Sequence, residues 1–298
     1  MELQWPLIIF TTFIAWSAGV FGMQGLLAAR GTAFKAQMPT LITAFVIMVV
    51  GGIAVFFHLE HWERIFNGFG HITSGITQEL IGIIVMVVVM VVYFAQLRQR
   101  NDGTVAKWCG VLAVVIAVVL VVAMGHSYMM DSRPAWNSVV QVLSLLGASC
   151  VLGPATVAAC MACCGDDPAA LSPFVLIGSV VNAITGLGFM LVMGSAQDFY
   201  ASLGYWYDPT QIARGMIDFE AATGIMHESR MGLVVLTAIL MLVPVVLAAL
   251  CRIKGAEGAS GLGRWKALSI AIVVVAAASA VALRVLFYGM GAAMYMFY

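Results

Sequence analysis

The polar side chains best suited to proton chemistry lie in residues 58–79, between two long apolar segments. His58 ends the first apolar segment and Glu79 begins the second, so a hairpin would bring both to the same membrane level. An imidazole that titrates near neutrality beside a carboxyl group is suited to proton relay. We therefore expect His58 and Glu79 to act together. For the other ionisable loop residues, the simpler interpretation is a position at the headgroup boundary: Glu60, His61, Glu63 and His71.

A second polar group follows a later apolar segment, at residues 125–136. Tyr128 and Arg133 could hydrogen-bond a ligand that arrives from the lipid, and Trp136 could stack on its ring. Pro134 marks a turn before the next apolar segment. Ordinary anchoring at the membrane interface explains Trp136 about as well as ligand stacking does.

The elements that position these groups are membrane spans. The chain has 298 residues, of which 62% are hydrophobic and 9% are charged. Soluble domains have about 25% charged residues, whereas about 20 consecutive apolar residues cross a bilayer as a helix. The sequence therefore predicts an all-α integral membrane protein, with one domain over residues 1–298 and eight up-and-down helices. The predicted helices are Trp5–Ala29, Met38–His58, Glu79–Leu97, Lys107–Gly125, Trp136–Ala162, Leu171–Gly194, Met231–Cys251 and Lys266–Tyr288.

The distribution of basic residues predicts the orientation of the spans. The connections after the first, third, fifth and seventh spans hold nine Lys or Arg residues, and the opposite side holds four. The basic side is therefore expected to be cytoplasmic, with both termini periplasmic and residues 58–79 on the periplasmic side. The net charge of zero gives no indication of nucleic-acid binding.

Several cofactor and motif classes find no support in the sequence. A haem pair across the membrane needs histidines within the spans near both faces, but all five histidines fall at the outer side; a single outer haem is the only haem arrangement left open. No nucleotide-binding or zinc-protease motif is present. We interpret the cysteines as buried thiols, with a metal or cluster site near Cys160, Cys163 and Cys164 as the alternative.

Four segments resemble the membrane anchor subunits of bacterial dimethyl sulfoxide reductases. Residues 58–67, His-Leu-Glu-His-Trp-Glu-Arg-Ile-Phe-Asn, are similar to that family's His-Leu-x(4–5)-Arg-Ala-Phe-Asn segment, which precedes a glutamate at the next span, here Glu79. The family often has Gly-Ser-Pro after His-Leu, where this chain has Glu-His-Trp. The similarity covers the first 160 residues and includes three further segments: Glu2–Thr11, Tyr128–Trp136 and Gly153-Pro154.

The resemblance implies that His58 and Glu79 belong to a quinol-oxidising site, with Arg64 and Asn67 near it. It also implies an anchor without haem or metal, which passes electrons to an iron–sulfur subunit and from there to a molybdopterin catalytic subunit on the periplasmic face. We expect menaquinol to enter between the second, third and fourth spans of this inner-membrane protein and to be oxidised without proton pumping. Tyr128, Arg133 and Trp136 complete the expected quinol-binding set.

Three alternatives stay open at this point. One is a polysulfide- or nitrite-reductase type of quinone anchor, in which proton translocation could be coupled to quinone chemistry. A non-redox transporter would fit the eight spans, although no repeated pair of broken helices is visible. A purely structural anchor would leave the ionisable residues of 58–79 unexplained.

Overall fold

The computed structural model describes residues 4–58, 61, 67, 69–100, 103–202, 223–254 and 258–292. Within these residues the chain is all-helical, without strands, and eight helices are long and apolar enough to cross a membrane. Their bounds are α1 Trp5–Ala29, α2 Gln37–Phe56, α3 Gly75–Gln99, α4 Lys107–Ser127, α5 Val139–Cys164, α6 Ser172–Ser202, α8 Glu228–Lys254 and α9 Gly258–Gly289. A short 3₁₀ turn, η2 (Ala169–Leu171), precedes α6.

The helix ends follow local signals in the sequence. Pro6 lies in the first turn of α1, where its missing N–H is not needed. The Ser138 side chain accepts a hydrogen bond from the Val140 N–H and caps the start of α5. Gly165, with φ of 78°, ends α5 in the left-handed conformation that glycine adopts without steric cost.

Four predicted helix starts differ from the observed ones by three residues or more, those of α3, α5, α8 and α9. The first two concern predicted site residues. α3 begins at Gly75, so Glu79 lies one turn inside the helix instead of opening it. α5 begins at Val139, so Trp136 belongs to the preceding loop. The hydropathy profile misplaced both starts because Thr77 and Gln78 are polar but helical, whereas Trp136 is apolar but lies in a loop.

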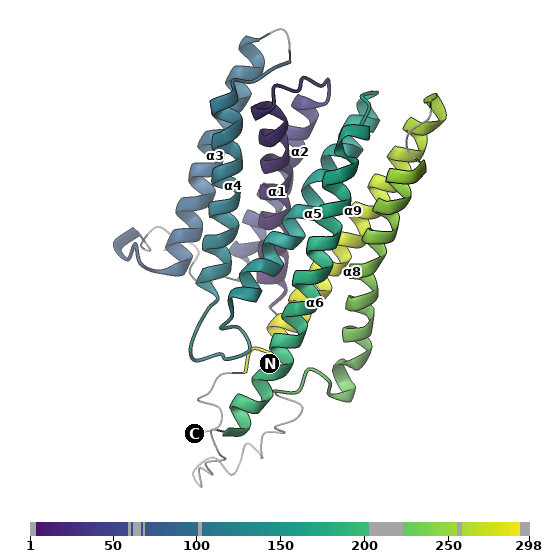
Figure 1. The fold of residues 1–298 in the computed structure, drawn as a ribbon. Helices are drawn as coiled ribbons and strands as arrows, with labels where there is room; N and C mark the ends of the chain where they lie inside the picture. The colour runs from purple at the N-terminus through teal and green to yellow at the C-terminus, as the bar shows by residue number, and fades with distance from the viewer. Residues whose placement is uncertain are drawn as a thin grey trace.

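The helices form two neighbouring groups that meet through α1 and α5 (Figure 1). α1 packs against α2, α4 and α5, and α3 packs against α4. α5 packs against α6 and α9, while α8 covers α9 and α6. α1 and α5 are accordingly the most buried helices of the bundle.

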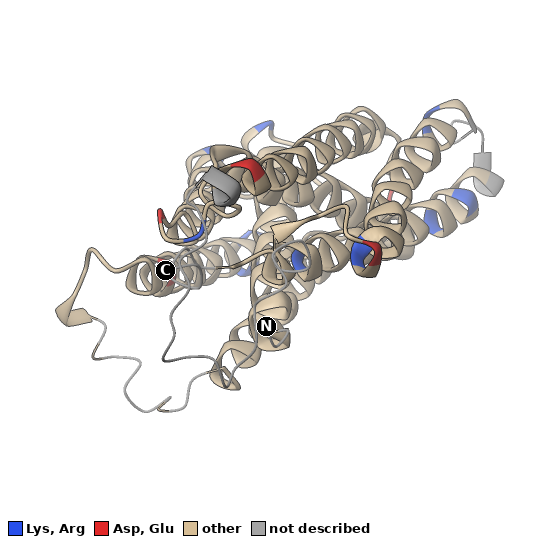
Figure 2. Ribbon diagram, turned by 90° about the horizontal axis from the view of Figure 1, so that it is seen from below, with Lys and Arg blue, Asp and Glu red and all other residues tan. Residues whose placement is uncertain are grey.

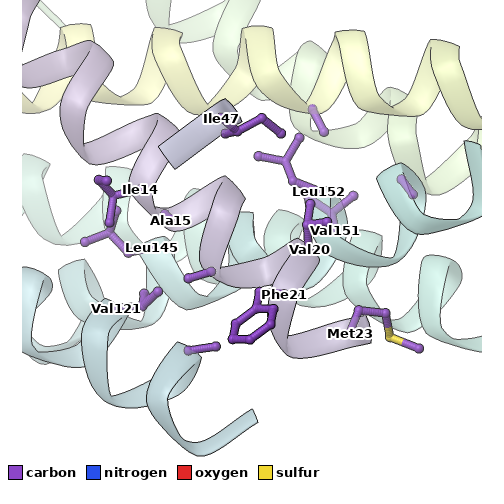
Figure 3. Packing of buried hydrophobic residues seen from close by; sticks show 14 of the residues in the cluster. Ile14, Ala15, Val20, Phe21, Met23, Ile47, Val121, Leu145, Val151 and Leu152 are labelled. Atoms are coloured by element: carbon purple, nitrogen blue, oxygen red, sulfur yellow. The ribbon is translucent and has the colours of Figure 1, made fainter. Parts of the chain in front are cut away.

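The core around α1 consists of side chains from several helices (Figure 3). Phe21 and Ile14 of α1 are fully buried there. Figure 3 shows Ile47 of α2, Val121 of α4 and Leu145 of α5 around this segment. Such a core excludes lipid from the centre of the bundle, because interdigitated side chains leave no room for it.

Glycines allow α1 and α4 to approach closely. A Cβ on Gly110 would lie 2.6 Å from the Gly25 carbonyl oxygen, and a Cβ on Gly25 would lie 2.7 Å from the Gly110 carbonyl oxygen. Small residues at such contacts are typical of helix pairs in membranes, where close backbone packing replaces the hydrophobic effect. The two glycines therefore fix the distance between α1 and α4.

The outer surface of the bundle is apolar, as lipid contact requires. Most of the helical ribbon in Figure 2 is tan, the colour of residues other than Lys, Arg, Asp and Glu. Large aliphatic side chains face outward on several helices, among them Val118, Ile184 and Leu191. The chain is thus a multi-pass membrane protein.

The six cysteines are all free thiols, but their burial differs from the prediction. Cys109 and Cys251 are buried, as expected, whereas Cys150 and Cys163 are exposed on the bundle surface. The prediction failed for these two because an apolar run does not tell which face of its helix points to lipid. Among the described residues, no group of three His, Cys, Asp or Glu side chains is placed to hold a metal ion.

Candidate functional site

A cavity of about 340 Å³ lies at the end of the bundle where α1 begins and α4 ends. A volume of this size is typical of small-molecule sites. The cavity brings together residues from α1, α2, α3, α4, α9 and the loop between α4 and α5. Its lining residues are Gln4, Leu7, Phe10, Val55, His58, Ile76, Glu79, Ser127, Tyr128, Met130, Arg133, Trp136 and Tyr288.

Glu79 is the buried acid of this cavity. Only 7% of its surface is exposed, and its carboxyl group lies one turn inside α3. The Ser127 hydroxyl at the end of α4 donates a hydrogen bond to Glu79 Oε1 and also lies 2.8 Å from the Met124 carbonyl oxygen. Ser127 therefore fixes the carboxyl group against α4, facing the cavity.

His58 follows α2, two residues beyond its last residue, Phe56. Its backbone N–H donates to the Val55 carbonyl oxygen over 3.0 Å, which continues the chain in a turn after the helix. The residue as a whole is exposed, yet it lines the same cavity as Glu79. The cavity is thus lined by an exposed histidine and by a buried carboxyl group.

Tyr128 is part of an aromatic wall. Its ring meets those of Trp136, Phe287 and Tyr288 edge-on, with centroids 5.8 to 6.2 Å apart. Burial raises the pKa of the Tyr128 hydroxyl well above its ordinary value; Tyr288 and Glu79 add to this effect, and Arg284 opposes it. The phenol therefore remains protonated at neutral pH and can serve as a hydrogen-bond donor, not as a base.

Trp136 and Arg133 connect the loop before α5 to the end of α9. The Trp136 ring stacks on Phe287 with centroids 4.4 Å apart, and its Nε1–H donates to the Phe287 carbonyl oxygen over 2.7 Å. Arg133 lies 4.5 Å from the Trp136 ring centroid and donates to the Gly291 carbonyl oxygen. Trp136 is 5% exposed, so it packs inside the protein and does not serve as a surface anchor at the membrane interface.

Five of the seven predicted site residues therefore line one cavity: His58, Glu79, Tyr128, Arg133 and Trp136. Asn67 is exposed and is not among the lining residues. Arg64 lies outside the described residues, so its predicted place near the site stays a prediction.

The sequence reasoning missed three polar residues of the cavity, Gln4, Ser127 and Tyr288, and a fourth behind it, Arg284. Tyr288 lies near the end of α9, 160 positions after Tyr128, and no local pattern links the two. Arg284, one turn earlier, is 3% exposed and donates to the Ser144 hydroxyl over 2.8 Å. The only available signal was a lone arginine inside an apolar span, which is usually functional.

The chain matches the family model of the DMSO reductase anchor subunit (DmsC) over residues 1–290. The match extends through α9 and so includes the second half of the chain, where the sequence motifs had given no resemblance. No curated protein and no solved structure shows significant similarity to the chain.

Proposed function

The chain belongs to the family of DMSO reductase anchor subunits, and from this premise we propose that it oxidises menaquinol in the cavity around His58 and Glu79. As such an anchor it is the non-catalytic membrane subunit of a DMSO reductase-type complex, associated with an iron–sulfur subunit and a catalytic subunit that carry the cofactors. The finer proposal concerns the electron donor and the residues that handle its protons.

One observation supports the proposal above all: a basic and an acidic side chain from different helices face one cavity with aromatic walls. His58 follows α2 and Glu79 belongs to α3, and both line the same volume of about 340 Å³. Tyr128 and Trp136 line this cavity with aromatic rings, which suit contact with a flat aromatic headgroup. Such a cavity can hold a quinol ring and also accept its hydroxyl protons.

Oxidation of menaquinol to menaquinone releases two electrons and two protons. In the proposed reaction the His58 imidazole accepts a hydroxyl proton, and the Glu79 carboxyl group relays protons to the water that reaches exposed His58. The Ser127 hydroxyl positions Glu79 for this step. The two electrons pass to the iron–sulfur subunit, which we place on the same, periplasmic side of an up-and-down bundle in the inner membrane.

The direct test replaces Glu79 by the isosteric amide. Glu79→Gln is expected to lower menaquinol-driven reductase activity by at least about 100-fold, since it removes a proton-transfer group. Reduction driven by a water-soluble artificial donor that feeds the catalytic subunits should be unchanged. Glu228→Gln is the matched control, because Glu228 is exposed at the start of α8 and does not line the cavity.

The second variant, His58→Gln, is expected to behave in the same way: menaquinol-driven activity falls, and activity with the artificial donor is unchanged. Assembly is checked by copurification of the partner subunits, so that a folding defect is recognised. Full menaquinol-driven activity in both variants would remove these residues from the mechanism.

A further inference from the structure

A second hollow lies on the flank of the bundle and has no part in the proposed quinol chemistry. This flank groove, of about 250 Å³, is lined almost only by apolar atoms of α1, α4, α5 and α6. Val118 of α4 and Ile177 of α6 line it and are 47% and 60% exposed, so the groove opens toward lipid. α4 and α6 form its walls, and α1 and α5 form its floor.

Glycines create the depth of the flank groove. Gly22 on the floor has no side chain, and a Cβ there would lie 3.1 Å from the Ala117 Cβ. On the wall, Gly178 lies directly against the Cys150 carbonyl group, so that α6 packs closely on α5.

The flank groove is about as long as one leaflet is thick. Its lining on α1 runs from Ala18 to Leu26, a rise of about 12 Å at ~1.5 Å per residue. That length fits within one leaflet of a hydrocarbon core about 30 Å thick.

Two cations lie at one end of the flank groove. The Arg30 guanidinium, directly after α1, lies 4.8 Å from the ring centroid of Phe174, which itself lines the groove. Lys107 begins α4, and its Cε lies 3.8 Å from the position that a Cβ would take on Gly31, the neighbour of Arg30. Both cations are exposed.

The start of α4 also favours an anion at this end of the flank groove. The start of α4 has no side-chain cap, and uncapped helix starts present N–H groups to anions. The carboxylates of Asp166 and Asp167, which follow α5, oppose an anion here, although each already accepts a hydrogen bond from a backbone N–H, of Ala36 and of Ala169 respectively. Trp108 is 59% exposed beside Lys107, as is common for tryptophan at the headgroup level.

We propose that the flank groove binds an anionic phospholipid, with one acyl chain between α4 and α6 and the phosphate held by Arg30 and Lys107. An arginine and a lysine at the end of an apolar groove match the two parts of such a lipid: guanidinium and ammonium groups bind phosphate, and the apolar walls bind the chain. The site lies at the start of α4, whereas the quinol cavity lies at its end. It therefore belongs to the opposite leaflet.

The test measures lipid binding to the purified, delipidated complex by native mass spectrometry. Phosphatidylglycerol is compared with phosphatidylcholine of the same acyl chains. Phosphatidylglycerol is expected to remain bound and to raise the melting temperature, whereas phosphatidylcholine does neither. The double variant Arg30→Gln/Lys107→Gln should weaken phosphatidylglycerol binding about 30-fold, because each cation near the headgroup contributes a few-fold.

The control for charge is Arg98→Gln/Arg100→Gln, which removes one cation from the last turn of α3 and one directly after it; α3 does not line the flank groove. The control for shape compares Val118→Phe, which fills the groove, with Val119→Phe on the lipid-facing side of the same helix. Phosphatidylglycerol binding should fall in Val118→Phe alone.

Equal binding of the two lipids, or full binding to Arg30→Gln/Lys107→Gln, would refute the proposal. Displacement of the lipid by a long-chain menaquinone would assign the flank groove to the quinol tail instead, and would equally refute it. The result is independent of the quinol site, since Glu79→Gln should leave lipid binding unchanged.

Discussion

At the scale of single residues, burial distinguishes Glu79 from Asp131, another acid near this end of the bundle. Asp131 is exposed and accepts a hydrogen bond from the exposed Asn137, so water can solvate it. Glu79, by contrast, lies among helices with only the Ser127 hydroxyl as its donor in the described structure. An ionisable group in such a place is costly to bury and is commonly retained for function.

The Ser127 hydroxyl is therefore expected to matter for the rate. Ser127→Ala removes the donor to Glu79 and should lower menaquinol-driven activity about tenfold, because a hydrogen bond to a charged or buried group contributes about 1.5 kcal/mol. The measurement is quinol-driven reductase activity, with the artificial donor as reference. Ser195→Ala is the control, since Ser195 is exposed and bonds only the Val192 carbonyl oxygen. Wild-type activity in Ser127→Ala would show that Glu79 needs no positioning by α4.

At the scale of helices, α9 completes the site although its own sequence is mostly aliphatic. The loop before α5 is hydrogen-bonded to the end of α9. Trp136 donates to the Phe287 carbonyl oxygen, and Arg133 donates to the Gly291 carbonyl oxygen. These contacts place Tyr288 in the cavity beside Tyr128. At the α1–α4 interface, Gly25 and Gly110 set the spacing of two helices that contribute Gln4 and Ser127 to the same cavity.

The α1–α4 spacing gives a prediction about stability. Gly110→Ala should lower the melting temperature of the complex, because the new Cβ would lie 2.6 Å from the backbone nitrogen of Ala29, and backbone atoms cannot move aside cheaply. Gly52→Ala is the matched control within a helix: nothing lies within 4 Å of its Cβ position. It should be neutral or stabilise by about 0.5–1 kcal/mol through helix propensity. Equal melting temperatures for the two variants would contradict the close packing of α1 and α4.

At the scale of the whole molecule, the orientation in the membrane decides which compartment the cavity around His58 and Glu79 faces. Gln4 and Tyr288, near the two ends of the described chain, both line this cavity. The start of α1 and the end of α9 therefore lie at the same end of the bundle. Arg30 and Lys107 mark the opposite end, which the positive-inside rule assigns to the cytoplasm.

Reporter fusions test this orientation. An alkaline phosphatase fused after the C-terminus should be active, because the phosphatase needs the oxidising periplasm for its disulfides. A fluorescent protein fused at the same place should not fluoresce. Fusions inserted between α1 and α2, near Gly31, should give the opposite pair of signals. A fluorescent C-terminal fusion would place the cavity in the cytoplasm and overturn the periplasmic assignment.

The sequence alone determined the number of spans, because each run of about 20 apolar residues must form its own helix in lipid. It also singled out His58, Glu79 and Tyr128, since polar groups at the ends of apolar runs stand out locally. Only the tertiary structure decided that Ser127 bonds Glu79 and that Tyr288 joins the cavity. Hydropathy reports whether a residue tolerates lipid, but which helix faces lie together depends on packing between segments far apart in the chain, as at Gly25 and Gly110.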